Sequence, residues 1–82
     1  MTIDIKEFAE TYSNYYRKLY YDRNFAATYE DTARDFYDMV LVKRDNVKAF
    51  LKRFCEYQMD IITSDREAAA FALAYSEYAS IN

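Results

Sequence analysis

The chain has 82 residues and a formal net charge of −3, and it contains no glycine, proline, histidine or tryptophan. A chain of this length is expected to form a single domain, spanning residues 1–82. Because 52% of the residues are hydrophobic and 20% are aromatic, the composition favours a folded chain over a disordered one, which would be poor in aromatic residues. The missing histidine excludes imidazole as a catalytic base or metal ligand, and the missing glycine excludes a glycine-rich phosphate-binding loop.

The absence of glycine also bears on the fold class. Tight β-hairpin turns need residues that adopt positive φ, and glycine does so most easily. Helices that are connected by Asn, Asp, Ser and Thr have no such need. We therefore predict an all-α fold, a small compact bundle of four short helices.

The first predicted helix covers residues 5–21, a segment that holds five of the ten tyrosines. Asp4 and Glu7 have the spacing of a capping box at its start, and Asn24, which tolerates left-handed φ, is a plausible stop after it. At a step of about 100° per residue, one arc of this helix is apolar. It comprises Ile5, Phe8, Tyr12, Tyr15, Tyr16 and Leu19. Most of these tyrosines are therefore predicted to be core or core edge, whereas Tyr21 points away.

Thr28 and Asp31 predict the start of a second helix in the same way. Its apolar face is predicted to comprise Tyr29, Ala33, Phe36, Tyr37 and Val40. Continuing the same helix would place Lys43 and Arg44 on that face, which favours a break near residues 43–46. The alternative is a bundle of three helices in which residues 29–62 are continuous.

The third helix is predicted to bury Val47, Phe50, Leu51, Phe54, Tyr57, Ile61 and Ile62. Ser64 and Glu67 form the clearest capping box in the chain and open a last helix over about residues 65–80. Its predicted inward face comprises Ala68, Phe71, Ala72, Tyr75 and Tyr78. No linker divides the chain into two domains.

The residue types present argue against an enzyme. Cys55 is the only cysteine, so no internal disulfide or redox pair can form, and its position beside Phe54 indicates an inert, partly buried thiol. Asp31, Asp35 and Asp38 lie opposite the apolar face, in water, where carboxylate pKa shifts are small. We expect no catalytic residue, no metal site and no cofactor.

The first candidate surface for a partner is an acidic helix face edged by a tyrosine. Spacings of three and four residues align such charges along a helix, where they can match the Lys and Arg clusters of a basic, nucleic-acid-binding protein surface. The candidate residues are Tyr21, Asp22, Glu30, Asp31, Asp35 and Asp38. The alternative is a solubilising surface in which Arg34 pairs with Glu30.

The second candidate surface is basic and would suit a nucleic-acid-binding regulator. It comprises Arg44, Lys48, Lys52 and Arg53. The nearby Phe50 and Phe54 are predicted to face the core, which leaves no platform for base stacking. With the negative net charge, this makes direct binding of nucleic acid the weaker hypothesis.

The third candidate surface lies on the last helix, opposite its predicted core side. Ala69, Ala70 and Leu73 make this helix apolar on most of its circumference, which is typical of a helix buried on two sides. It is either the central helix of the domain or a face that packs against another chain, including a second copy in a homodimer. The sequence leaves these two interpretations open.

The leading functional hypothesis is a non-enzymatic protein-binding module, a small inhibitor or regulator that occupies a partner's surface. Phage or mobile-element antagonists of host defence, anti-CRISPR proteins among them, are one such class; the suggestion rests on size and composition. The alternatives are a nucleic-acid-binding regulator and a structural homo-oligomer subunit. A single cysteine and a start without a secretory signal predict a cytoplasmic location. The longest apolar run, residues 68–75, is too short to span a membrane.

Overall fold

The computed structural model of the chain describes residues 3–80. Four α-helices follow one another: α1 (Ile5–Tyr21), α2 (Arg23–Met39), α3 (Asp45–Gln58) and α4 (Asp65–Ser80), with the short 3₁₀ helix η1 (Leu41–Lys43) between α2 and α3. The described residues contain no β-strand. The prediction of an all-α bundle of four short helices is confirmed.

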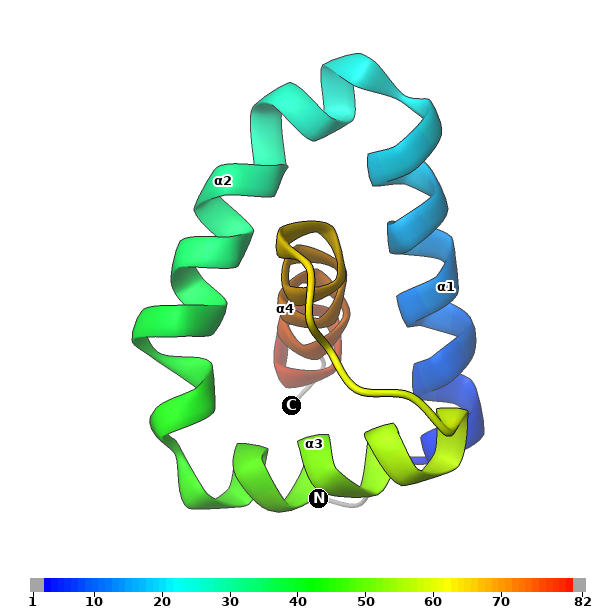
Figure 1. Cartoon of the computed structure of the whole chain (residues 1–82), viewed down its shortest axis with the longest axis vertical. Helices are drawn as coiled ribbons and strands as arrows, with labels where there is room; N and C mark the ends of the chain where they lie inside the picture. The colour runs from blue at the N-terminus through cyan, green and yellow to red at the C-terminus, as the bar shows by residue number, and fades with distance from the viewer. Residues whose placement is uncertain (1–2, 81–82) are drawn as a thin grey trace.

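The helix α4 is the central element of the molecule. Figure 1 shows α1, α2 and α3 as three sides of a frame, with α4 running through the middle and seen almost along its axis. The most extensive packing is that of α4 against α2, followed by that of α4 against α1. Alanines at 68, 69, 70, 72 and 74 are buried, and their small side chains let α1 and α2 approach this helix closely.

Phenylalanine rings from three helices meet at the centre of the core. The Phe71 ring of α4 lies 5.2 Å from the Phe8 ring of α1 and 5.8 Å from the Phe54 ring of α3. The Phe8 ring also meets the Phe50 ring edge-on at 4.7 Å. Such aromatic pairs each add about 0.5–1.5 kcal/mol beyond the burial of their area, so this cluster fixes α1, α3 and α4 to one another.

A single residue, Asp22, makes the corner between α1 and α2. Its backbone N–H donates to the Lys18 carbonyl at 2.9 Å and ends α1, while its side-chain Oδ1 accepts from the Phe25 N–H at 3.1 Å and starts α2. The predicted span of the first helix is confirmed. The predicted stop at Asn24 and the predicted start at Thr28 are wrong, because the capping by Asp22 places both residues inside α2.

The predicted break between the second and third helices is confirmed, and the alternative of one continuous helix over residues 29–62 is wrong. The helix α2 ends at Met39, and η1 turns the chain so that Leu41 is buried. Lys43 and Arg44 stay exposed, which is the physical reason for the break: a continuous helix would have carried both charges onto the buried face.

The third helix is shorter than predicted. It ends at Gln58, and Met59 follows in the left-handed region with φ 59°. Tyr57 and Ile61 were predicted to be buried but are 49% and 64% exposed. Ile61 lies in the connection after Gln58, where the helical phase no longer applies, and Tyr57 lies in the last turn of α3, at the edge of the core. The capping box that opens α4 is confirmed: the Glu67 N–H donates to Ser64 Oγ at 3.1 Å, and Glu67 Oε1 accepts from the Ser64 N–H at 3.2 Å.

Candidate functional site

The acidic residues in the middle of α2 line up on its outward face. Asp31, Asp35 and Asp38 are all exposed, and spacings of four and three residues place them on one side of a helix. Asp35 pairs with Arg34, whose Nη2 lies 2.9 Å from the Asp35 Oδ1. Within residues 3–80, Asp31 and Asp38 form no salt bridge. We call Asp31, Asp35 and Asp38 the acidic row.

The other acidic candidates have partners within the fold. Glu30 is partly buried and its Oε1 lies 3.3 Å from Arg66 Nε of α4, so the predicted pairing of Arg34 with Glu30 is wrong. Arg34 instead reaches Asp65 at the start of α4, at 3.3 Å. The Asp22 carboxylate caps α2. The two ion pairs with Arg66 and Asp65 tie α2 to α4, and the acidic row remains as the exposed acidic surface of α2.

An exposed apolar stripe runs beside the acidic row on α2. Tyr29, Phe36 and Met39 are 45%, 37% and 68% exposed. Tyr29 and Phe36 were predicted to face the core, and this is wrong, because α4 covers the α2 face only as far as the buried Ala33. With Leu73 of α4, among other residues, Tyr29 and Phe36 line a shallow groove of about 210 Å³ between the two helices. We call Tyr29, Phe36 and Met39 the apolar stripe.

The structure decides between the two interpretations of the last helix. Ala69 and Ala70 are fully buried against the chain's own helices, so they form no surface for a dimer or another partner. Leu73 is partly exposed in the groove beside α2. The sequence alone could not make this choice, because an apolar circumference has the same pattern in a central helix and in a subunit interface.

The four basic candidates all lie on the exposed side of α3 or at its start. Arg44, Lys48 and Lys52 are exposed. Arg53 packs its guanidinium over the Phe50 ring at 5.8 Å and donates to the Ile3 carbonyl at 3.5 Å. Phe50 and Phe54 are buried, as predicted, so neither ring gives the basic residues a platform for base stacking.

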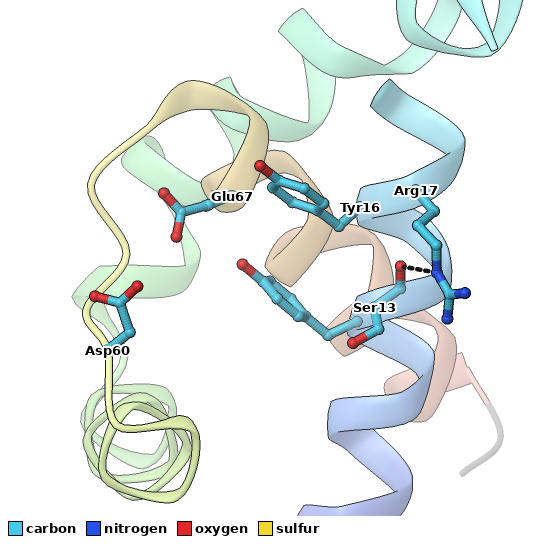
Figure 2. Close-up of a pocket in the computed structure, with 6 residues that line it drawn as sticks. Ser13, Tyr16, Arg17, Asp60 and Glu67 are labelled. Atoms are coloured by element: carbon cyan, nitrogen blue, oxygen red, sulfur yellow. Dashed lines mark hydrogen bonds between the residues drawn. The ribbon is translucent and has the colours of Figure 1, made fainter. Parts of the chain in front are cut away.

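A polar hollow lies between α1 and the connection from α3 to α4. Its volume is about 460 Å³, and it is lined by Tyr12, Ser13, Tyr16, Arg17, Asp60 and Glu67. In Figure 2 the carboxylates of Asp60 and Glu67 point toward one another on one side of this hollow, and Arg17 extends away from them on the other. The Arg17 Nε donates to the Ser13 carbonyl of its own helix at 3.4 Å. We call this site the polar hollow.

Tyr12 is the most deeply buried residue of the polar hollow, with 8% of its surface exposed. Its ring packs edge-on against Phe54 at 4.9 Å. Burial, followed by the negative charge of Glu67, raises the pKa of Tyr12 well above its ordinary value. Its hydroxyl is therefore protonated at physiological pH and is available to donate or accept a hydrogen bond.

The sequence did not reveal the polar hollow. Tyr12 was predicted correctly as a core residue and Glu67 as a cap, but nothing related them to Asp60. These residues belong to α1, α4 and the connection before α4. The sequence signal for this site was Asp60 itself, an acidic residue between the apolar residues Met59 and Ile61. This pattern is too common in proteins to identify a binding site.

The single cysteine of the chain lies in an environment that lowers its reactivity. Cys55 is partly buried, as predicted, and burial raises the pKa of its thiol above the ordinary value, so the reactive thiolate is scarce at neutral pH. Residues 3–80 contain no cluster of three or more side chains that could hold a metal ion.

In the same part of the chain, no helix is both long and apolar enough to cross a lipid bilayer.

Comparison with protein-family models, with curated protein sequences and with solved structures finds no match to this chain. The surfaces described above are therefore interpreted from their own geometry and chemistry.

Proposed function

We propose that the protein is a non-enzymatic binding module that occupies a basic surface on a partner protein through the exposed side of α2. The observation that carries this proposal is that α2 exposes both the acidic row and the apolar stripe. Charges of one sign select a partner of opposite charge and speed its association. Exposed aromatic and methionine side chains supply apolar area of the kind that is enriched in protein interfaces.

The fold supports a rigid binding surface. Glu30 and Arg34 on the flank of α2 pair with Arg66 and Asp65 of α4, so α2 is held by ion pairs as well as by packing. A helix face that is ordered before binding loses little conformational entropy in the complex. An inhibitor that acts by covering a basic site, in the manner of phage-encoded antagonists of host defence such as anti-CRISPR proteins, would work in this way.

The test compares two charge-reversed variants with the same change in net charge. Asp31→Lys/Asp38→Lys alters the acidic row at its two positions without a salt bridge and leaves Asp35 with Arg34. Glu10→Lys/Glu56→Lys alters exposed positions on α1 and α3 and serves as the control. Each protein is immobilised and exposed to an extract of the native host, and the captured proteins are identified and then titrated in purified form.

We expect a basic protein to be captured by the unaltered chain and by the control. Its affinity for Asp31→Lys/Asp38→Lys should fall by about tenfold or more, because like charges placed opposite one another cost several kcal/mol. Equal affinity for both variants would refute the proposed role of α2.

A further inference from the structure

The two carboxylates of the polar hollow point toward one another (Figure 2). Asp60 and Glu67 take part in none of the salt bridges among residues 3–80. Arg17 is the basic residue that lines the hollow, and in Figure 2 it extends away from both carboxylates. Its Nη2 lies 3.4 Å from the Asn14 side-chain oxygen. Among residues 3–80, neither carboxylate is therefore neutralised by a basic side chain.

Each carboxylate uses one of its two oxygens to cap the backbone. Asp60 Oδ1 accepts from the Ile61 N–H at 2.8 Å. Glu67 Oε1 accepts from the Ser64 N–H at 3.2 Å and from Ser64 Oγ at 2.8 Å. In the described part of the chain, no hydrogen bond reaches Asp60 Oδ2 or Glu67 Oε2. The capping bonds hold both side chains in place while these two oxygens stay free.

The Tyr12 hydroxyl is a third free group in the same hollow. Tyr12 is more than nine-tenths buried, it lines the hollow, and its hydroxyl has no hydrogen-bond partner among residues 3–80. The hydroxyl itself is accessible from the hollow, because Arg34 Nε is the buried side-chain atom without a partner among residues 3–80. This feature is independent of the two carboxylates, because Tyr12 belongs to α1 and is positioned by its packing against Phe54.

We propose that the polar hollow binds an organic cation, the guanidinium or primary ammonium group of a ligand, between Asp60, Glu67 and Tyr12. An ammonium group has three N–H donors and a guanidinium has five, and the hollow offers three free oxygens in total. Charge-assisted hydrogen bonds to carboxylates are the strong ones. The ring of Tyr16 adds an aromatic face, to which cations are attracted. This site is separate from the acidic row and does not depend on the function proposed for α2.

Two probes distinguish the two sources of such a cation. Putrescine represents a free amine, and the capped peptide acetyl-Gly-Arg-Gly-amide represents an arginine side chain of a protein. The peptide acetyl-Gly-Glu-Gly-amide and sodium chloride at matched ionic strength are the negative probes. Each is titrated into the ¹⁵N-labelled protein, and the amide shifts of the residues around Asp60 and Glu67 are followed by NMR. We expect saturable shifts with at least one cationic probe, and the tighter one identifies the source.

The matched variants are Asp60→Asn/Glu67→Gln and Asp31→Asn/Asp38→Asn, which remove the same amount of negative charge. Asn and Gln keep an oxygen for the capping bonds, so the first variant loses charge but retains its caps. We expect it to bind the cationic probe about tenfold or more weakly, while the α2 variant binds like the unaltered chain. Tyr12→Phe, which keeps the ring in the core, should weaken binding by about threefold or more.

Three results would overturn the proposal. The first is the absence of saturable shifts with both cationic probes. The second is equal weakening by the two double variants, which would mean non-specific attraction to a negatively charged protein. The third is unchanged binding by Asp60→Asn/Glu67→Gln. Should that double variant fail to fold, Asp60→Asn alone and Tyr12→Phe decide the question, and unchanged binding by both would refute the site.

Discussion

Met59 adopts the left-handed backbone conformation that glycine adopts most easily, although the chain contains no glycine. Its φ of 59° is the only positive value among the described residues, and its side chain is 90% exposed. A left-handed conformation costs a residue with a Cβ atom about 1–2 kcal/mol. Two hydrogen bonds at the end of α3 offset this strain. The Met59 N–H donates to the Glu56 carbonyl, and the Asp60 N–H donates to the Cys55 carbonyl.

Replacing Met59 with glycine should stabilise the protein. The variant Met59→Gly removes the strain and loses a side chain that is almost wholly in solvent. The greater flexibility of glycine in the unfolded chain offsets part of this gain. We expect the free energy of unfolding, measured by urea denaturation, to rise by about 0.5–1 kcal/mol. That corresponds to an increase of a few degrees in the melting temperature.

Ile61 provides the control for this prediction. It is also exposed, but its φ is not positive, so Ile61→Gly adds flexibility to the unfolded chain without relieving strain. The free energy of unfolding of Ile61→Gly should therefore be equal to that of the unaltered protein or slightly lower. A Met59→Gly variant that is as stable as Ile61→Gly, or less so, would contradict the strain at Met59.

At the scale of the elements, Asp22 shows how two helices can share one residue. Its extended backbone, with φ −107° and ψ 100°, is open to any residue, so this corner needs no glycine. What makes aspartate the suitable residue is its carboxylate, which accepts from the Phe25 N–H at the start of α2. The start of α2 therefore depends on this one side chain.

The variant Asp22→Ala should lose this cap. Replacing a capping aspartate with alanine typically costs about 0.5–2 kcal/mol, and urea denaturation should show a loss of about 1 kcal/mol. Asp22→Asn, which keeps an oxygen acceptor, should stay within about 0.5 kcal/mol of the unaltered chain. Asp31→Ala removes an exposed carboxylate from the interior of the same helix and should not destabilise it. Equal stability of all three variants would show that Asp22 does not cap α2.

Local signals were enough to predict α1 and α4. The span of α1, residues 5–21, follows from the cap at Asp4 and from an apolar arc along the helix. The span of α4, residues 65–80, follows from the capping box at Ser64 and from the apolar run after it. The start of α2 was mispredicted because Thr28 and Asp31 imitate a capping box, whereas Asp22 is followed by Phe25 instead of Glu or Gln at the third helical position. The local sequence pattern was therefore stronger at Thr28, which does not cap α2, than at Asp22, which does.

At the scale of the whole molecule, the sequence could indicate which side of a helix is apolar but not how far a neighbouring helix would cover it. The apolar side of α2 is wider than the contact that the alanine-rich α4 makes with it, so Tyr29 and Phe36 remain exposed. The acidic row was predicted from spacing alone. The polar hollow could not be predicted, because Tyr12, Asp60 and Glu67 come together only when the connection before α4 lies beside α1.

The buried position of α4 leads to a prediction about the whole molecule. Ala70 is fully buried in α4, where a larger side chain would have to push the surrounding helices apart. Such overpacking typically costs about 1–3 kcal/mol, a large share of the stability of a domain this small. We therefore expect Ala70→Leu to unfold at a clearly lower urea concentration, while Ala49→Leu, at an exposed position of α3, should be tolerated.

Light scattering on the same two variants separates a central helix from a subunit interface. A central α4 requires that Ala70→Leu lowers stability without changing the molar mass of the folded protein, because the altered contacts lie within one chain. If the face with Ala70 instead packed against a second copy, the unaltered chain would be a dimer, and Ala70→Leu would dissociate it into monomers of undiminished stability. That result would contradict the buried position of α4 and return its alanine-rich face to the candidate binding surfaces.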